Sequence, residues 1–233
     1  MTIFAIGDLH LPAEEKPMDM FGDHWIDHFD RISEDWRARV GEDDLVLIPG
    51  DITWAMQLAA AGPDLASIGA LPGRKILTRG NHDYWWGSIG RVREALPEGM
   101  YALQNDAMQM DGVLIAGTRG WTLATDPESD PADVKIFQRE LLRLEMSLKA
   151  ARKISEDLPL VVMMHFPPLY DQQRVTPFTE LLEKYRADHV VYGHLHGAGL
   201  YSAFRGEAGG VRYHQVSCDG LGFKLYQVLT TEN

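Results

Sequence analysis

The chain has 233 residues, of which 45% are hydrophobic and 24% charged, and its formal net charge is −12. These values are typical of a globular protein with one sizeable α/β core. A surface this acidic repels long polyanions, so neither duplex nucleic acid nor an anionic membrane is an expected partner. Small anionic substrates remain compatible with it, because bound metal ions would reverse the field locally.

The sequence carries no sign of export or of membrane insertion. Its apolar runs fall short of the roughly 18 residues that span a membrane, and the N-terminus lacks a basic region followed by an apolar stretch. The single cysteine, Cys218, excludes an internal disulfide and suits a reducing compartment, and we expect it to pack as a small hydrophobe. We therefore expect a cytoplasmic protein, and no obligate protein partner is evident.

Apolar runs typical of buried strands alternate with helical patterns through the first half of the chain. The strands are expected at residues 3–6, 45–48 and 75–78. Between the first two, apolar residues from Trp25 to Val40 recur at steps of three and four, which predicts a core-facing helix over residues 23–40. Two further helices are expected over residues 55–68 and 84–96, the second stopped by a proline.

The second half opens with an Asp-Gly hairpin signature, flanked by strands expected at residues 107–110 and 113–116. The clearest helix comes next, with apolar residues from Phe137 to Ala151 at helical spacing and Asp133 as the expected cap. Strands are then expected at residues 160–164 and 189–192, and antiparallel β-structure at residues 199–204, 211–217 and 223–228. No linker divides the chain, so we expect one domain over residues 1–233.

Five motifs rich in polar side chains each follow one of the expected strands. They are Asp8-Leu9-His10, Gly50-Asp51, Gly80-Asn81-His82-Asp83, His165 and Gly193-His194-Leu195-His196. Side chains at strand ends gather along one edge of an α/β sheet, where ligand sites lie. Carboxylates, an amide and imidazoles together are the ligand mix of a pair of divalent metals. Each motif alone is also explained by a turn or a surface histidine, but five in this order are a specific signal.

In order and spacing these motifs resemble the signature of the calcineurin-like metallophosphoesterase superfamily, D-x-H, G-D, G-N-H-[DE], H and G-H-x-H. The resemblance spans residues 8–196. It implies an α/β fold, a four-layered α/β/β/α sandwich with metals at the strand ends, and metal-dependent hydrolysis of phosphoric esters. The Gly-Thr-Arg-Gly-Trp motif at residues 117–121 and the stretch at residues 16–22 are similar to a bacterial branch of predicted phosphohydrolases.

The resemblance also implies a role for each motif residue. One metal would be bound by Asp8, His10 and His196, and a second by Asn81, His165 and His194. The Asp51 carboxylate would bridge the two ions, which we expect to be Mn²⁺, with Fe²⁺ or Zn²⁺ as alternatives because nitrogen and oxygen ligands select weakly. His82 would lie over the substrate as the general acid, and Asp83 would support it by hydrogen bonding.

The expected chemistry follows from the charges of such a site. Two divalent ions can bind a phosphoryl oxygen and lower the pKa of a bridging water, and with Asp8, Asp51 and a hydroxide the site carries a charge of about +1. A protonated His82 can then donate to the leaving alkoxide. With no cluster of arginines or lysines beside the motifs, we expect a small phosphodiester as substrate. The alternatives are a phosphomonoesterase acting on a small metabolite and a non-catalytic metal-binding scaffold.

Two residues outside the ligand set are candidate substrate contacts. Arg119 offers a forked donor for a phosphate, although it would equally suit a solvated loop or a pair with a carboxylate. Trp85 and Trp86 follow the third motif, and one ring is expected to wall the pocket while the other packs inside. Purple acid phosphatases carry an iron-binding tyrosine where this chain has Trp54, so an iron–tyrosinate site is not expected. The physiological substrate, the native metal and the oligomeric state are not determined by the sequence.

Overall fold

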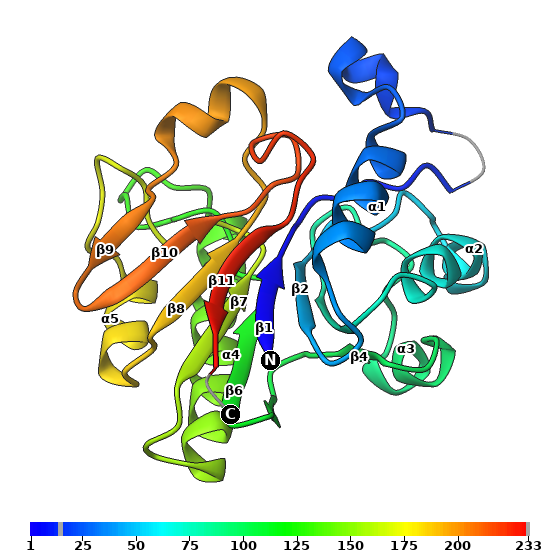
Figure 1. Cartoon of the computed structure of the whole chain (residues 1–233). Coiled ribbons are helices and arrows are strands. Elements are labelled where there is room, and N and C mark those ends of the chain that lie inside the picture. The colour runs from blue at the N-terminus through cyan, green and yellow to red at the C-terminus, as the bar shows by residue number, and fades with distance from the viewer. Residues whose placement is uncertain (14–15, 232–233) are drawn as a thin grey trace.

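The central strands carry apolar side chains on both faces, so the chain buries them between other layers. The computed structural model describes residues 1–13 and 16–231, which form two stacked sheets with helices on the outer faces (Figure 1). The first sheet has the order β11-β1-β2-β3-β4, with β1 at Thr2–Ala5, β2 at Leu45–Pro49, β3 at Arg74–Thr78, β4 at Met100–Ala102 and β11 at Tyr226–Thr230. The second has the order β5-β6-β7-β8-β10-β9, with β5 at Ala107–Met110, β6 at Val113–Thr118, β7 at Leu160–Met164, β8 at His189–Tyr192, β9 at Gly206–Ala208 and β10 at Val211–Gln215.

Helices cover the outer face of each sheet. The first sheet is covered by α1 at His28–Arg39, α2 at Leu58–Gly69 and α3 at Ile89–Ala95, and the second by α4 at Pro131–Ile154 and α5 at Pro177–Lys184. Three short 3₁₀ helices lie in the connections, η1 at Met18–Phe21, η2 at Asp23–Trp25 and η3 at Gly197–Ser202. Within the described ranges, no helix has both the length and the apolar character that crossing a membrane requires.

Alternate residues of the strands belong to different layers of the core. Ile3 of β1 points between the sheets and shares that core with Val161 of β7. The next residue, Phe4, faces outward and packs in the cluster that includes Trp36 of α1. On the far side, Leu148 of α4 packs on the outer face of the second sheet. This alternation confirms the four-layered α/β/β/α sandwich expected from the sequence.

The strands that precede the ligand motifs run parallel to their neighbours. In the first sheet β1, β2 and β3 are parallel, and in the second β6, β7, β8 and β10 are parallel. The antiparallel strands β11, β5 and β9 lie at the sheet margins. Because parallel strands end at the same edge, the loops that follow them collect there.

Two predicted helices begin elsewhere than expected. The helix expected over residues 23–40 is interrupted because Asp27 has a left-handed φ of 49°, and only the part after it forms α1. The long helix α4 is capped by Asp130 and not by Asp133, because the Asp130 side chain accepts a hydrogen bond from the Ala132 N–H and a proline occupies the first turn.

The helix expected over residues 84–96 is reduced to α3. The two tryptophans before it are held in an irregular segment, since the Trp85 indole N–H donates to Asp83 at 3.0 Å and that of Trp86 donates to Gln104 at 2.8 Å. Both tryptophans are buried. Contacts with other loops therefore override the local helical pattern in this segment.

The C-terminal end is only partly antiparallel. Residues 199–204 were expected as a strand, but most of them form η3. This helix connects β8 to the region of β9 and β10, and β10 pairs in parallel with β8 and antiparallel only with β9. The last strand, β11, crosses to the other sheet and pairs antiparallel with β1.

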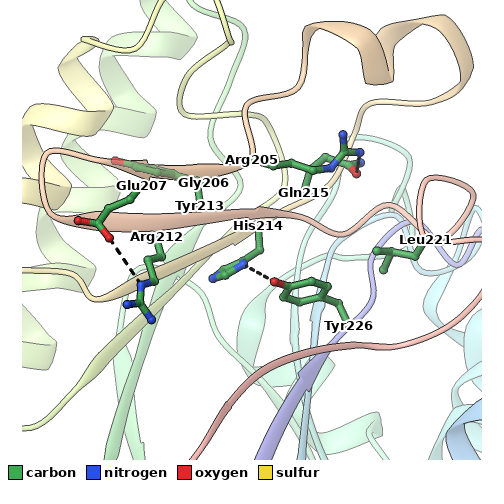
Figure 2. Close-up of a pocket in the computed structure, with 9 residues that line it drawn as sticks. All are labelled: Arg205, Gly206, Glu207, Arg212, Tyr213, His214, Gln215, Leu221 and Tyr226. Carbon is green, nitrogen blue, oxygen red and sulfur yellow. Dashed lines mark hydrogen bonds and ion pairs between the residues drawn. The ribbon is translucent and has the colours of Figure 1, made fainter.

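A groove of about 390 Å³ lies where β10 and β11 face each other (Figure 2). Inside it, His214 Nδ1 lies 3.1 Å from the Tyr226 hydroxyl, and His214 Nε2 lies 2.9 Å from His189 Nδ1. At its rim, Arg212 pairs with Glu207 at 3.7 Å. Of these contacts, the one between His214 and Tyr226 links the second sheet to the margin of the first.

Candidate metal centre

The loops that follow the strands adopt tight turns that bring their side chains to one point. Asp8, His10, Asp51 and His194 all have left-handed φ values, of 57°, 45°, 52° and 71°. Such φ values are uncommon for residues other than glycine and concentrate at functional sites. The first two turns are tied together, because Asp8 N–H donates to the Gly50 carbonyl at 3.0 Å and His10 N–H donates to that of Asp51 at 2.9 Å.

Asp8, His10 and His196 form one group of potential ligand atoms. His10 Nε2 lies 3.3 Å from His196 Nε2, which lies 3.6 Å from Asp8 Oδ1. Asp8 and His10 are buried, and His196 is partly exposed. A carboxylate and two imidazoles whose ligand atoms lie within 4.8 Å of one another are able to hold one ion.

A second group adjoins the first. Asp8, Asp51 and His165 present ligand atoms within 4.8 Å of one another, and His165 Nε2 lies 3.4 Å from Asp51 Oδ2. The Asn81 side-chain oxygen lies 2.7 Å from His165 Nε2 and 3.0 Å from His194 Nδ1. All seven residues that the resemblance implies as ligands therefore lie together at one edge of the two sheets.

The imidazoles are held by their outer nitrogens. His165 Nδ1 donates to the Pro49 carbonyl at 3.0 Å, which turns its Nε2 toward the Asn81 oxygen at 2.7 Å. His196 Nδ1 likewise contacts Asp219 at 2.9 Å, which leaves its Nε2 facing Asp8. Outer partners of this kind orient metal-binding histidines.

The electrostatics of the groups also favour a cation. Burial raises the pKa of Asp51 to about 7, against the opposing charge of His165, and the charges of Asp83 and Asp8 raise it further. Burial, together with the charge of His165, lowers the pKa of His194 to about 4. The His194 imidazole is therefore neutral, as metal binding requires, and a bound cation would offset the burial and like charges that raise the pKa of Asp51.

Comparison with known proteins identifies the chain. The family model of calcineurin-like phosphoesterases matches residues 1–198. The chain belongs to this family. It is a metal-dependent phosphoric ester hydrolase of a dinuclear family, and it has two groups of residues that are able to hold metal ions. Comparison with curated protein sequences gives no match.

Two solved structures are similar to this phosphoesterase over nearly their whole lengths. One is the phosphopantetheinyl hydrolase of Mycobacterium tuberculosis, with a TM-score of 0.58 and 17% identity over 99% of this chain and 96% of that one. The other is a protein of unknown function from Aquifex aeolicus, with a TM-score of 0.49 and 18% identity over 97% of this chain and 95% of that one. At this identity the first of them supports the fold alone.

Asp83 of the phosphoesterase does not support the His82 ring as expected. Its carboxylate accepts hydrogen bonds from the N–H groups of Gly80 at 2.7 Å and of Asp51 and Ile52 at 2.9 Å each. These bonds join the loop after β3 to the loop after β2. Asp83 therefore positions Asp51, because its carboxylate is occupied by these backbone donors and by the Trp85 indole, and no hydrogen bond from the His82 ring reaches it in the described parts of the chain.

His82 lies at the border between the ligand groups and an apolar pocket. Its backbone N–H donates to Asp51 Oδ1 at 2.8 Å, and its ring centroid lies 4.4 Å from that of Trp54. The ring nitrogen Nδ1 is buried and has no hydrogen-bond partner among the described residues. Burial lowers the pKa of His82, and the charges of His165 and Lys16 lower it further. The ring also lines the adjoining pocket, so a molecule bound there would contact it.

The pocket beside His82, here called the aromatic pocket, has a volume of about 360 Å³. Its lining comprises His10, Met18, Phe21, His24, Trp25, Trp54, His82, His196, Gly197 and Asp219. Trp54 stacks on His10 with ring centroids 4.9 Å apart, and Lys16 Nζ lies 3.2 Å from the Trp54 ring centroid. The sequence did not reveal this wall, because Trp54 was noted only as a residue that binds no metal.

Arg119 and Trp85 lie outside the aromatic pocket. The Arg119 guanidinium is 3.7 Å from Glu140 and 4.6 Å from the Trp121 ring centroid, so it takes the alternative of a pair with a carboxylate. Trp85 is 3% exposed, and its indole N–H binds Asp83, so it packs inside the fold. The aromatic contact expected from Trp85 is available instead from Trp54.

Proposed function

We propose that this phosphoesterase hydrolyses a small phosphodiester at a dinuclear centre. Asp8, His10 and His196 would hold one divalent ion, Asn81, His165 and His194 the other, and Asp51 both. The observation that carries this proposal is the position of Asp51 Oδ2, which is 3.7 Å from His10 Nε2 in one group and 3.4 Å from His165 Nε2 in the other. When bound, such ions supply Lewis acidity to a phosphoryl group and to an attacking water.

His82 is the proposed general acid. Its ring borders both the ligand groups and the aromatic pocket, so a phosphoryl group at the centre would place its leaving oxygen within reach of the imidazole. A protonated ring would donate to that oxygen as the ester bond breaks. The backbone bond from His82 to Asp51 couples the position of the acid to that of the proposed bridging ligand.

The preference for a diester rests on the surroundings of the centre. The aromatic pocket offers an apolar surface to an organic ester arm, and Arg119 is engaged by Glu140 and does not line that pocket. A singly charged diester needs less positive charge than a dianionic monoester. Hydrolysis of a small monoester is the second candidate, and the position of Lys16 over Trp54 favours it by adding a cation beside the pocket.

Mn²⁺ is the metal we propose, with Fe²⁺ or Zn²⁺ as alternatives. We further propose that the enzyme acts in the cytoplasm on a small ester and needs neither nucleic acid, membrane nor an obligate protein partner. The net charge of −12 supports this proposal.

Kinetics with paired substrates test the diester preference. With Mn²⁺ at pH 7–8, kcat/KM for a bis-aryl phosphate should exceed that for the matching aryl monophosphate, and Lys16→Gln should widen the difference. Lys135→Gln, which removes an exposed charge on α4, is the control and should leave the ratio unchanged. A monoester preference in the wild type that Lys16→Gln reverses would establish the second candidate. Because the similar mycobacterial protein is named a phosphopantetheinyl hydrolase, a phosphopantetheinyl ester belongs in the same comparison.

A further inference from the structure

No cluster of arginines was expected beside the motifs, but four arginines converge on a second pocket, here called the arginine pocket, formed by Arg79, Arg119, Arg139 and Arg143 around Glu140. Its volume is about 260 Å³. Arg79 follows β3, Arg119 follows β6, and the other two lie on α4, so elements distant in the sequence build it together. Glu140 is fully buried at its base and accepts a hydrogen bond from the Thr118 hydroxyl at 2.7 Å.

The arginine pocket holds more positive charge than its glutamate can balance. One oxygen of Glu140 serves three guanidinium groups, at 2.7 Å from Arg143, 3.7 Å from Arg119 and 3.9 Å from Arg139. No described residue forms an ion pair with Arg79. Four arginines against one glutamate leave an excess of three positive charges, in a protein whose net charge is −12.

The arginine pocket also holds donors that lack acceptors. The Nε atoms of Arg79 and Arg119 are buried and find no hydrogen-bond partner in the described parts of the chain. Burial lowers the pKa of Arg119, Glu140 opposes this shift, and the charges of Arg79, Arg139 and Arg143 add to it. Buried donors without acceptors and crowded like charges are both relieved by a bound anion.

The arginine pocket adjoins the metal centre along the same edge of the sheets. Arg79 precedes the proposed ligand Asn81 by two residues in the loop after β3. The backbone carbonyl of Arg119 accepts a hydrogen bond from the N–H of His165 at 3.1 Å. Each of these arginines therefore shares its loop or its backbone contact with a proposed metal ligand.

We propose that the arginine pocket binds a phosphate-type oxyanion at a site separate from the metal centre. Guanidinium groups recognise such oxyanions through paired, charge-assisted hydrogen bonds. The oxyanion is either a second phosphate carried by the substrate or a free phosphate ion, which offer the pocket the same chemistry. This site goes beyond the proposed function, and its binding of inorganic phosphate does not depend on which ester is hydrolysed.

Calorimetric titration of the metal-loaded enzyme with inorganic phosphate tests the site. Because phosphate also binds metal ions, the titration is repeated in Asp51→Asn, where one phosphate should still bind per chain. Arg139→Gln should weaken this binding about ten-fold or more, the usual worth of a charge-assisted bond, and Arg143→Lys should weaken it less, because the charge remains. Lys135→Gln, on the same helix outside the pocket, should change it by no more than about two-fold.

Arg139 is suited to this test because its side chain is half exposed and its replacement leaves two arginines paired with Glu140. Circular dichroism of each variant serves as the control for folding. If Asp51→Asn abolishes all phosphate binding, or if Arg139→Gln and Arg143→Lys bind phosphate as Lys135→Gln does, the proposal is overturned. The cluster then serves only to anchor α4 to the strand ends. Loss of activity on every ester with phosphate binding retained would instead contradict the proposed function alone.

Kinetics distinguish the two sources of the oxyanion. If the substrate carries it, Arg139→Gln should raise KM about ten-fold for a diester that bears a further terminal phosphate and should leave KM for a bis-aryl phosphate unchanged. If it is a free ion, added phosphate should change the rate on the bis-aryl phosphate through a component that Arg139→Gln removes. If neither effect is found with binding confirmed, phosphate occupancy has no kinetic role and the site is a binding site only.

Discussion

His82 faces the aromatic pocket and belongs to neither group of ligand atoms. The carboxylate of its neighbour Asp83 accepts hydrogen bonds from backbone N–H groups of two loops, so the two adjacent residues have different roles. Asp83 ties the two loops together, and His82 extends from them toward the aromatic pocket. The division of roles follows from burial, because Asp83 is fully buried whereas His82 is partly exposed.

His82→Ala should lower turnover by roughly 10²–10⁴, the usual contribution of a general acid. The loss should shrink for esters with good leaving groups, since these need little protonation. Metal content should stay the same, because the imidazole holds no proposed ligand position. Turnover with a series of aryl leaving groups, together with elemental analysis, provides the measurement. An equal loss for every leaving group, or a lost metal ion, would contradict the assignment.

At the scale of elements, two glycines at strand ends make room for the carboxylates. A Cβ on Gly193, after β8, would collide with the Asp8 carboxylate, and one on Gly80, after β3, would collide with Asp51. Neither glycine has a left-handed φ, so these positions require glycine for space and not for backbone conformation. The close approach of the loops is therefore part of the geometry of the centre.

Gly193→Ala should weaken metal binding and destabilise the protein by about 1–3 kcal/mol, the usual cost of overpacking. Gly62→Ala is the matched control, because its Cβ would meet no atom within 4 Å and it lies within α2. The control should keep full metal content and gain up to about 1 kcal/mol. Urea unfolding and metal analysis of both variants make the comparison. Similar stability and metal content in the two variants would show that the fold accommodates the added Cβ, and would contradict this prediction.

The contact between β8, β10 and β11 should make stability depend on pH. Burial lowers the pKa of His214 to about 4, and the charges of His189 and Arg212 add to this effect. In the unfolded chain the pKa returns to about 6.5. As the pH falls from about 6.5 toward 4, the unfolded state takes up a proton that the folded state resists, so the free energy of unfolding decreases.

Urea unfolding at pH 7.5 and pH 5 tests this dependence. The loss of stability between the two pH values should be smaller in His214→Gln than in the wild type, because the variant lacks the titrating group. Histidines of the metal centre titrate in both proteins, so their contribution cancels in the comparison. Equal losses in the two proteins would show that His214 is not the group responsible.

For the whole molecule, metal binding and folding are coupled. The buried carboxylates and imidazoles come from loops of both sheets, so a bound ion joins the two halves of the sandwich. An ion that binds only the folded state stabilises it by about 2.7 kcal/mol at a concentration one hundred times its Kd. Carboxylates that repel each other in the metal-free protein increase the difference in stability between the metal-bound and the metal-free states.

Chelation should therefore lower Tm and abolish activity, and Mn²⁺ should restore both. The wild type should bind two ions per chain at saturation. Asp51→Asn should lose activity, bind both ions more weakly and show a smaller rise of Tm with Mn²⁺, because the shared carboxylate loses its charge. Thermal unfolding followed by circular dichroism, with elemental analysis, provides the measurement. Activity that survives chelation, or saturation with one ion, would contradict the dinuclear centre.

The sequence by itself determined the family, the sandwich and the set of residues that meet at one edge of the sheets. Each of these depends on local patterns, because a buried strand is visible as an apolar run and its end carries the motif that follows it. Parallel strands then place their ends together without further information. The proximity of Asp8, Asp51 and His165 could therefore be predicted before any contact was known, whereas the α/β/β/α order was implied by the family resemblance of the motifs.

Only the tertiary structure decided which groups the other side chains contact. The Asp83 carboxylate binds backbone donors and not His82. The aromatic pocket is lined by Trp54 and not by Trp85, and Arg119 forms an ion pair with Glu140. These contacts join segments far apart in the chain, and local spacing carries no information about them. The physical reason is that a side chain follows burial, charge and available donors, which exist only after the sheets and helices have packed.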